Sequence, residues 1–188
     1  MRVSVKAAPR LPGHGASGGN LARMIRVDHA GEFGAVQIYR GQLAVLGHTA
    51  CGDTIKHMEA QELAHLQKFD ALVAEHGVRP TVLSPVWSVA GYALGAVTAL
   101  LGEKVAMACT AAVEEVIDEH YASQVAALAQ DGAAHAEFKA VIEAFREDEI
   151  AHRETAIEHG AEDAPGYEVL SEAIKTGCRL AIRLSERF

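Results

Sequence analysis

The chain has 188 residues, with 49% hydrophobic and 22% charged side chains, which suits one folded domain and excludes a disordered polar chain. Its 25 acidic and 17 basic side chains give a formal net charge of -8. This argues against a nucleic-acid partner, because phosphates require a basic surface. The three cysteines, Cys51, Cys109 and Cys178, are odd in number and far apart, which is typical of reduced thiols rather than a disulfide framework.

The first twenty residues contain three basic side chains, no acid and a Gly-rich end, and no apolar run of a secretory signal follows them. We expect a disordered tail over 1–20, with part of an organelle presequence as the alternative. From residue 21 onward the pattern is helical, and we find no convincing strand pattern. The sequence therefore predicts one all-α domain over 21–188.

Glycine and proline divide this domain into successive helices. Asp53 is the expected N-cap of the second helix and Gly77 its C-terminal cap. Ser84 and Pro85 have the pattern of an N-cap and a first helical residue, opening the third helix. Four long helices and two others predict a four-helix bundle with two additional helices, at 21–47, 53–76, 84–102, 103–130, 133–159 and 167–186.

Two of the long helices carry a Glu-x-x-His pair, Glu62 with His65 and Glu149 with His152. A spacing of three places both side chains of a pair on one helix face. The composition alone would give roughly one such pair by chance, so the motif by itself is weak. The stronger signal is that both pairs interrupt an apolar stripe, because a buried carboxylate needs a partner or a metal.

The other two long helices each place a glutamate on an apolar line, with a tyrosine seven residues later: Glu32 with Tyr39, and Glu114 with Tyr121. A Glu helix followed by a Glu-x-x-His helix thus occurs twice, which predicts an internal two-fold repeat. This is the ligand set of a carboxylate-bridged di-iron or di-manganese bundle. Surface glutamates and satisfied core histidines would explain any one residue, but not six in two matching halves.

Several polar residues near these positions have an open role. Asp118 and His120 either orient metal ligands through hydrogen bonds or are ordinary polar positions. Tyr39 and Tyr121 are either core aromatics or redox or gating residues. The neighbouring glutamates fall off the apolar lines and are expected on solvated faces: Glu59, Glu115, Glu119 and Glu147.

Five stretches of the chain resemble the demethoxyubiquinone hydroxylases of ubiquinone biosynthesis. They are 25–42 (IRVDHAGEFGAVQIYRGQ), the helix of Glu62 and His65, 107–121 (MACTAAVEEVIDEHY), 145–170 and 177–188 (GCRLAIRLSERF). The resemblance covers about 20–188 and implies a ferritin-like fold with two iron ions. It implies iron ligands at Glu32, Glu62, His65, Glu114, Glu149 and His152. Glu114 and one other helix carboxylate are candidate bridges, and the sequence does not decide which carboxylates bridge.

The same resemblance implies a di-iron monooxygenase that uses O2 to hydroxylate the ring of a polyprenylated demethoxy-quinol. An iron-binding or storage protein of ferritin type, or another di-iron oxidase, is the alternative, and a helical membrane adaptor is a third class. The expected partners are the quinol, O2, a membrane surface and an external reductant, because no Gly-rich dinucleotide site is seen. Other ubiquinone-biosynthesis proteins and a second copy of the chain are further candidates. We expect a peripheral location on the cytoplasmic face of a bacterial inner membrane, or on the matrix face of the mitochondrial inner membrane.

Residues 80–102 carry no charge and are numerous enough to span a bilayer. Prolines and glycines interrupt them, so we expect an apolar helix over 81–102 at the membrane interface, with Trp87, Tyr92 and Leu94 in contact with lipid. A core or oligomer interface and a spanning helix are the alternatives. On the last helix, the basic residues that recur every four positions predict a solvated face or a contact with lipid headgroups: Lys175, Arg179, Arg183 and Arg187.

Overall fold

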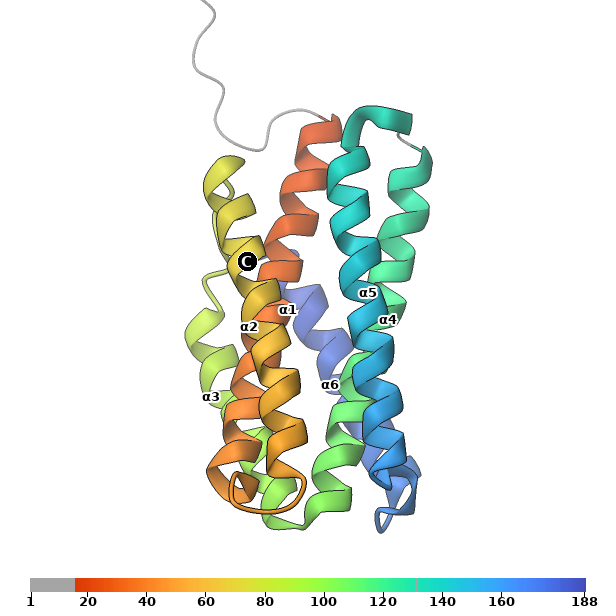
Figure 1. Ribbon diagram of the computed structural model, residues 1–188. Helices are drawn as coiled ribbons and strands as arrows, with labels where there is room; N and C mark the ends of the chain where they lie inside the picture. Colours follow the sequence, from red (N-terminus) through yellow and green to blue (C-terminus); the bar gives the residue numbers. More distant parts are fainter. Residues whose placement is uncertain (1–15, 131) are drawn as a thin grey trace, which may run out of the picture.

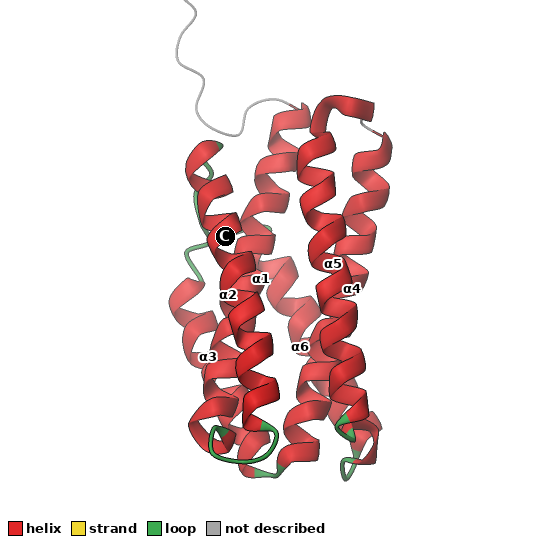
Figure 2. Ribbon diagram, viewed as in Figure 1, coloured by secondary structure: helices red, strands yellow, loops and turns green. Residues whose placement is uncertain are grey.

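The chain folds into a bundle of α-helices in the computed structural model, which describes residues 16–130 and 132–188 (Figure 1). The helices are α1 (Ala16–Leu46), α2 (Gly52–Glu75), α3 (Ser84–Leu100), α4 (Glu103–Gln130), α5 (Ala136–Glu158) and α6 (Tyr167–Ser185). Two short 3-10 turns, Gly132–His135 and Ala161–Asp163, flank α5, and the described residues contain no strand (Figure 2). The prediction of an all-α fold is confirmed.

The four long helices α1, α2, α4 and α5 lie side by side and form the bundle (Figure 1). α1 packs on α2 and α4 packs on α5, so each half of the internal repeat is a pair of neighbouring helices. α3 packs along the outside of α1, and α6 packs on α4. The result is the expected ferritin-like four-helix bundle with two additional helices.

The helix ends differ from the expected ends in a few places. α1 begins at Ala16, inside the expected tail, and residues 1–15 of that tail lie outside the described part of the chain. Asp53 does not cap α2, because its carboxylate accepts from Lys56 2.9 Å away and the helix already begins at Gly52. Gly77 has a φ of +60°, as expected for the residue that ends α2.

The start of α3 is shifted by one residue, because the turn before it is built differently. Leu83 occupies the N-cap position and Ser84 already belongs to the helix. Thr81 holds this turn: its hydroxyl accepts from the Leu83 N–H at 3.2 Å, and its carbonyl accepts from the Ser84 hydroxyl at 2.9 Å. Ser84 therefore uses its hydroxyl to close the turn and not to cap the helix.

The helix α4 contacts α1, α3, α5 and α6. Its first three turns are buried on nearly every side, and alanines there let the neighbouring backbones approach closely. Large apolar side chains fill the rest of the core, among them Ile25, Ile55, Phe69, Leu128 and Ile142. None of the described helices combines the length and the apolar character that crossing a bilayer requires.

Glycines bring α3 into close contact with the backbone of α1. A Cβ added at Gly95 would collide with the carbonyl of Ile38, and one at Gly41 would collide with the carbonyl of Tyr92. A Cβ at Gly91 would lie 2.9 Å from the carbonyl of Gly34. These neighbours are backbone atoms, which cannot move aside alone. The close packing of α3 on α1 therefore requires that these positions carry no side chain.

We predict that Gly95→Ala lowers the free energy of unfolding by about 1–3 kcal/mol, because the methyl group forces α3 away from α1. The matched control is Gly34→Ala on the facing helix, where a Cβ meets no atom of the described residues within 4 Å. That variant should be neutral or more stable, since alanine favours the helix. Equal denaturant midpoints for the two variants would contradict this account of the packing.

Candidate metal centre

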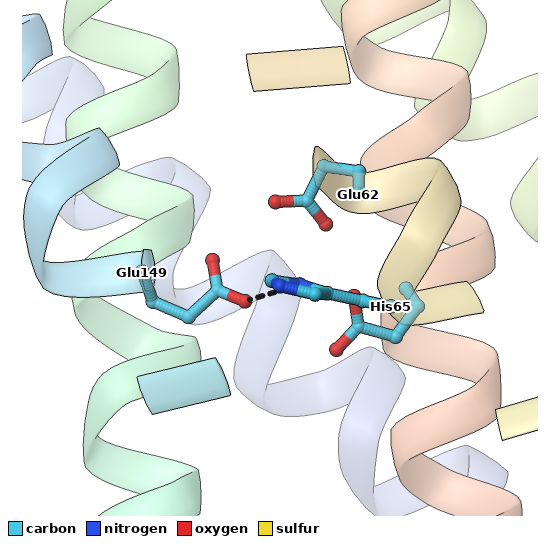
Figure 3. A group of neighbouring side chains, drawn as sticks. Glu62, His65 and Glu149 are labelled. Carbon is cyan, nitrogen blue, oxygen red and sulfur yellow. Dashed lines mark ion pairs between the residues drawn. The ribbon is translucent and has the colours of Figure 1, made fainter. Parts of the chain in front are cut away.

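Six buried side chains from the four long helices meet in the middle of the bundle. α1 and α4 each supply one glutamate, while α2 and α5 each supply a Glu-x-x-His pair, and every one of the six is at most 2% exposed. Glu62 and His65 point toward Glu149 across the bundle (Figure 3). The six form two overlapping groups whose ligand atoms lie within 4.8 Å of one another: Glu32, Glu62, His65 and Glu149, and Glu62, Glu114, Glu149 and His152.

Two of the four glutamates belong to both groups. Glu62 and Glu149 each have both carboxylate oxygens without a hydrogen-bond partner among the described residues. Glu32 and Glu114 each have only one such oxygen. Glu62 and Glu149 therefore offer two free oxygens each to a metal, and Glu32 and Glu114 offer one each, while a bridging role of Glu114 stays a prediction.

Two tyrosines hydrogen-bond to Glu32 and Glu114, the two glutamates that each belong to only one group. The Tyr39 hydroxyl of α1 donates to Glu114 Oε1 of α4 at 2.6 Å, and the Tyr121 hydroxyl of α4 donates to Glu32 Oε1 of α1. In each case the tyrosine of one half of the repeat thus contacts the glutamate of the other half. Burial, together with the nearby carboxylates, raises the pKa of both tyrosines well above the ordinary value, so both remain protonated donors. Each tyrosine therefore fixes one carboxylate and leaves its second oxygen free.

Each histidine is likewise held by a residue from the other half of the repeat. His65 Nε2 lies 3.0 Å from Asp148 Oδ2, and His152 Nε2 lies 3.1 Å from Gln61 Oε1. Gln61 in turn donates to Asp148 Oδ1 at 3.3 Å, which joins the two histidines through one chain of hydrogen bonds. With Nε2 engaged, Nδ1 of both rings faces the glutamates, 3.3 Å from Glu149 Oε1 for His65. Partners of this kind set the ring orientation of metal-binding histidines.

Gln61 and Asp148 were not predicted from the sequence. Each directly precedes the glutamate of a Glu-x-x-His pair, which was the available signal. They lie off the apolar stripe, where sequence reasoning places solvated residues, and Asp148 is indeed 41% exposed at its side chain. Their contacts run to the opposite half of the repeat, so that only the packed bundle shows them.

The two polar candidates next to Glu114 make other contacts. Asp118 accepts from Arg146 of α5 and not from a metal-facing histidine. His120 Nε2 lies 3.0 Å from Asp28 Oδ1, one helical turn before Glu32 on α1. Of the neighbouring glutamates expected on solvated faces, Glu119 is exposed, while Glu59 and Glu115 are half-buried. All three pair with bases: Glu59 with Arg40, Glu115 with Lys175 and Arg153, and Glu119 with Arg179. Lys175 and Arg179 are thus tied to α4, which leaves Arg183 and Arg187 for a headgroup contact.

Without a cation, the centre is electrostatically unfavourable. Burial first, and neighbouring carboxylates second, raise the pKa of Glu62 and Glu114 well above the ordinary value, while the pKa of Glu149 rises to about 7. Burial opposes charge on His65, but contacts with Glu149 and Glu32 outweigh it and raise its pKa to about 11. Buried charges of this kind are costly unless protons or metal ions compensate them.

The residues present fit a pair of hard cations. Carboxylate oxygens and imidazole nitrogens suit iron or manganese, and the atoms that face the centre are the ones without a hydrogen-bond partner in the described chain. These atoms are Glu32 Oε2, Glu114 Oε2, both oxygens of Glu62 and Glu149, and Nδ1 of His65 and His152.

An apolar cavity of about 530 Å³ extends from this centre between α1, α3, α4 and α6. Glu32 and Tyr121 form part of its wall, and Asp28 and His120 line it as well. Trp87 and Leu94 of α3 also line the cavity, and Trp87 donates to Ser185 Oγ of α6 at 3.0 Å. Trp87 and Leu94 are half-buried, whereas Tyr92 is exposed, and the lipid contact of these three residues stays a prediction.

The fold and the centre together define a ferritin-like bundle with a buried carboxylate–histidine cluster that could hold metal ions. A family model described as "Ubiquinone biosynthesis protein COQ7" matches residues 19–185. The chain belongs to this family.

Named relatives are similar over most of their length. The 3-demethoxyubiquinol 3-hydroxylase of Rhodospirillum rubrum is 53% identical over 182 residues, which cover 96% of this chain and 84% of the relative. The NADPH-dependent 3-demethoxyubiquinone 3-hydroxylase, mitochondrial, of Rattus norvegicus is 54% identical over 167 residues, covering 88% and 77%. The 5-demethoxyubiquinone hydroxylase, mitochondrial, of Saccharomyces cerevisiae is 44% identical over 181 residues, covering 89% and 78%.

The metal-binding role of the six residues can be tested by substitution. We predict that Glu149→Gln loses both metal ions, because Glu149 belongs to both groups, and that Glu114→Gln loses about one of the two. Glu115→Gln is the matched control, since Glu115 contacts Lys175 at 2.7 Å and should leave the metal content unchanged. Elemental analysis of the purified proteins measures this, and equal losses in Glu115→Gln and Glu149→Gln would refute the assignment.

The raised pKa values predict how pH affects the metal-free protein. When the pH rises above 4.5, the ordinary pKa of a glutamate, the unfolded chain loses protons that Glu62, Glu114 and Glu149 retain in the folded chain. The folded state then binds more protons, so the free energy of unfolding falls as the pH rises. His65 acts in the same direction above its ordinary value of 6.5, while the lowered pKa of His152 opposes the trend below that value.

Denaturant titrations of chelator-treated protein at about pH 5 and about pH 8 measure this effect. Metal ions should abolish or reverse the loss, because they bind the deprotonated groups. A metal-free protein that gains stability over this range would show that Glu62, Glu114 and Glu149 are not proton-linked to the fold in this way.

Proposed function

We propose that this chain uses O2 and a di-iron centre to hydroxylate the ring of a polyprenylated demethoxy-quinol in ubiquinone biosynthesis. The hydroxylase activity and the pathway agree with the names of the relatives. The observation that carries the proposal is the apolar cavity that ends at Glu32 and Tyr121, because it joins a ligand of the metal centre to a space suited to a prenylated ring.

Iron ions held by the six residues would supply the redox chemistry that activates O2. The chain itself performs the remaining tasks. Tyr39 and Tyr121 hold the two single carboxylates, and Gln61 and Asp148 hold the histidine rings, so the ligands are positioned before the substrate arrives. Ile38, Val113 and Ile174 exclude water from the cavity in which the ring would lie.

The prenyl tail would leave the cavity between α3 and α6, where apolar residues also face outward. Val89 and Leu100 of α3 are each 72% exposed, and Leu180 of α6 is exposed as well. Exposed apolar side chains on two neighbouring helices suit contact with a membrane, from which a tail of this kind can be drawn. The proposal therefore includes a peripheral position on the inner membrane, on its cytoplasmic face in a bacterium or on its matrix face in a mitochondrion.

Electrons come from an external reductant in this proposal. Some relatives are named NADPH-dependent, and we propose a nicotinamide donor or a reduced quinol for this chain as well. A ferritin-like storage protein needs a polar exterior that closes into a cage, and the exposed apolar residues of α3 do not fit such an exterior.

Quinone profiling of a deletion strain tests the reaction. A strain that lacks this chain should accumulate a quinone without one methoxy group, and the wild-type gene should restore the mature quinone. The Glu149→Gln variant should not restore it, because its metal centre is incomplete. Normal quinone in the deletion strain would refute the proposed function.

The membrane contact predicts which surface residues matter. Val89→Asp with Leu100→Asp should reduce binding to liposomes about tenfold or more, because burial of each apolar side chain contributes about 1.5–3 kcal/mol. Iron content should remain unchanged, since α3 supplies none of the six residues. The control is Ala126→Asp on the exposed face of α4. Co-sedimentation with vesicles measures binding, and equal loss in the control would contradict a contact through α3.

A further inference from the structure

Asp28 of α1 is a buried carboxylate in the cavity that the metal centre does not use. Its side chain is fully buried, and Oδ2 has no hydrogen-bond partner among the described residues. The other oxygen is held firmly: Oδ1 accepts from Gln124 Nε2 at 2.7 Å and lies 3.0 Å from His120 Nε2. An unpartnered buried oxygen is costly, so its presence in a cavity wall calls for a ligand that donates a hydrogen bond.

The position of Asp28 relative to the metal centre matches the dimensions of a quinol ring. Asp28 precedes Glu32 by four residues on α1, so the two side chains share a helix face and lie about 6 Å apart along the axis. In a 1,4-quinol, every ring carbon without a hydroxyl is adjacent to one hydroxyl-bearing carbon and further from the other. A ring whose reacting carbon lies beside Glu32 can therefore reach Asp28, one turn away on the same helix face, with its remote hydroxyl.

We propose that Asp28 Oδ2 accepts a hydrogen bond from the remote ring hydroxyl of the substrate and thereby selects the reduced quinol over the oxidised quinone. A quinone carbonyl can only accept, and it would meet the carboxylate oxygen without a hydrogen between them. This inference rests on the proposed function and adds to it a specificity-determining residue. His120 and Gln124 support the carboxylate, since both hold its opposite oxygen.

The surroundings of Asp28 strengthen this assignment. His120 also lines a second, more polar cavity of about 270 Å³, together with Arg23, Ser123 and Gln124. The pair of Asp28 and His120 thus separates the apolar cavity from a polar one, which is where the polar end of an otherwise apolar ligand fits. Burial raises the pKa of Asp28, and a more basic carboxylate is a better acceptor for a phenolic hydroxyl.

Trp87 makes this binding measurable, because it is the only tryptophan of the chain and lines the same cavity. The experiment titrates the full chain with its metals reduced and oxygen excluded, and follows quenching of the tryptophan fluorescence. Three probes with one prenyl unit are compared: the demethoxy-quinol, its quinone, and the quinol methylated at the hydroxyl remote from the reacting carbon. The wild-type chain should bind the quinol about tenfold more tightly than either of the other two.

Asp28→Asn is the decisive variant, because an amide both donates and accepts. It should bind all three probes with similar affinity and keep its metal content, and its KM for the quinol should rise more than its kcat falls. The matched control is Asp70→Asn, which removes the carboxylate from another His–Asp pair: Asp70 is exposed and lies 3.0 Å from His29 Nε2. The control should retain the preference for the quinol.

The possible results separate this inference from the proposed function. If the wild-type chain hydroxylates the quinol but binds the methyl ether equally well, or if Asp28→Asn keeps the tenfold preference, the role of Asp28 is refuted and the proposed function stands. If the wild-type chain binds none of the three probes, both fail. Should Asp28→Asn not fold, as judged by circular dichroism, the methyl ether on the wild-type chain decides the question alone.

Discussion

Four glutamates packed together in the interior impose the constraint on which the rest of this molecule depends. Each carboxylate is excluded from water and lies close to others of the same charge, so the fold needs compensating protons or cations at its centre. The raised pKa of Glu149, about 7, shows the conflict directly. The arrangement lowers the stability of the metal-free state, and bound metal ions would restore it.

The internal repeat is more than a duplication of helices, because each half completes the other. Tyr39 orients Glu114 of the second half, and Tyr121 orients Glu32 of the first. The histidine contacts cross in the same sense, through Asp148 and Gln61. The site can therefore form only when the α1–α2 pair packs against the α4–α5 pair, which couples metal binding to the complete fold.

The apolar cavity connects the six buried residues to the outer helices α3 and α6. It begins at Glu32, passes Asp28 and His120, and continues to α3 and α6, whose outer faces carry exposed apolar residues. The close contact of α3 with α1, which Gly95 and Gly41 permit, places one wall of the cavity. A helix that contributes no metal-facing residue thus shapes the access of a substrate to the centre.

Helical periodicity was sufficient to predict the six helices and to select Glu114 over Glu115, because a glutamate on an apolar line must be buried. It could not identify Gln61 and Asp148, since both lie at partly exposed positions and act on the opposite half of the repeat. It also could not identify the contact of Trp87 with Ser185, because an uncharged helix does not reveal which of its faces meets α6. What the sequence lacks in each case is the relative rotation of two packed helices.

We propose that Glu62 and Glu149, which belong to both groups, would hold two metal ions together with His65 and His152. Anomalous diffraction from crystals of the iron-loaded chain tests it most directly. We expect two iron peaks between α1, α2, α4 and α5, one beside Nδ1 of His65 and the other beside Nδ1 of His152, with Glu62 and Glu149 between them. A single peak, or iron bound elsewhere on the chain, would contradict this account.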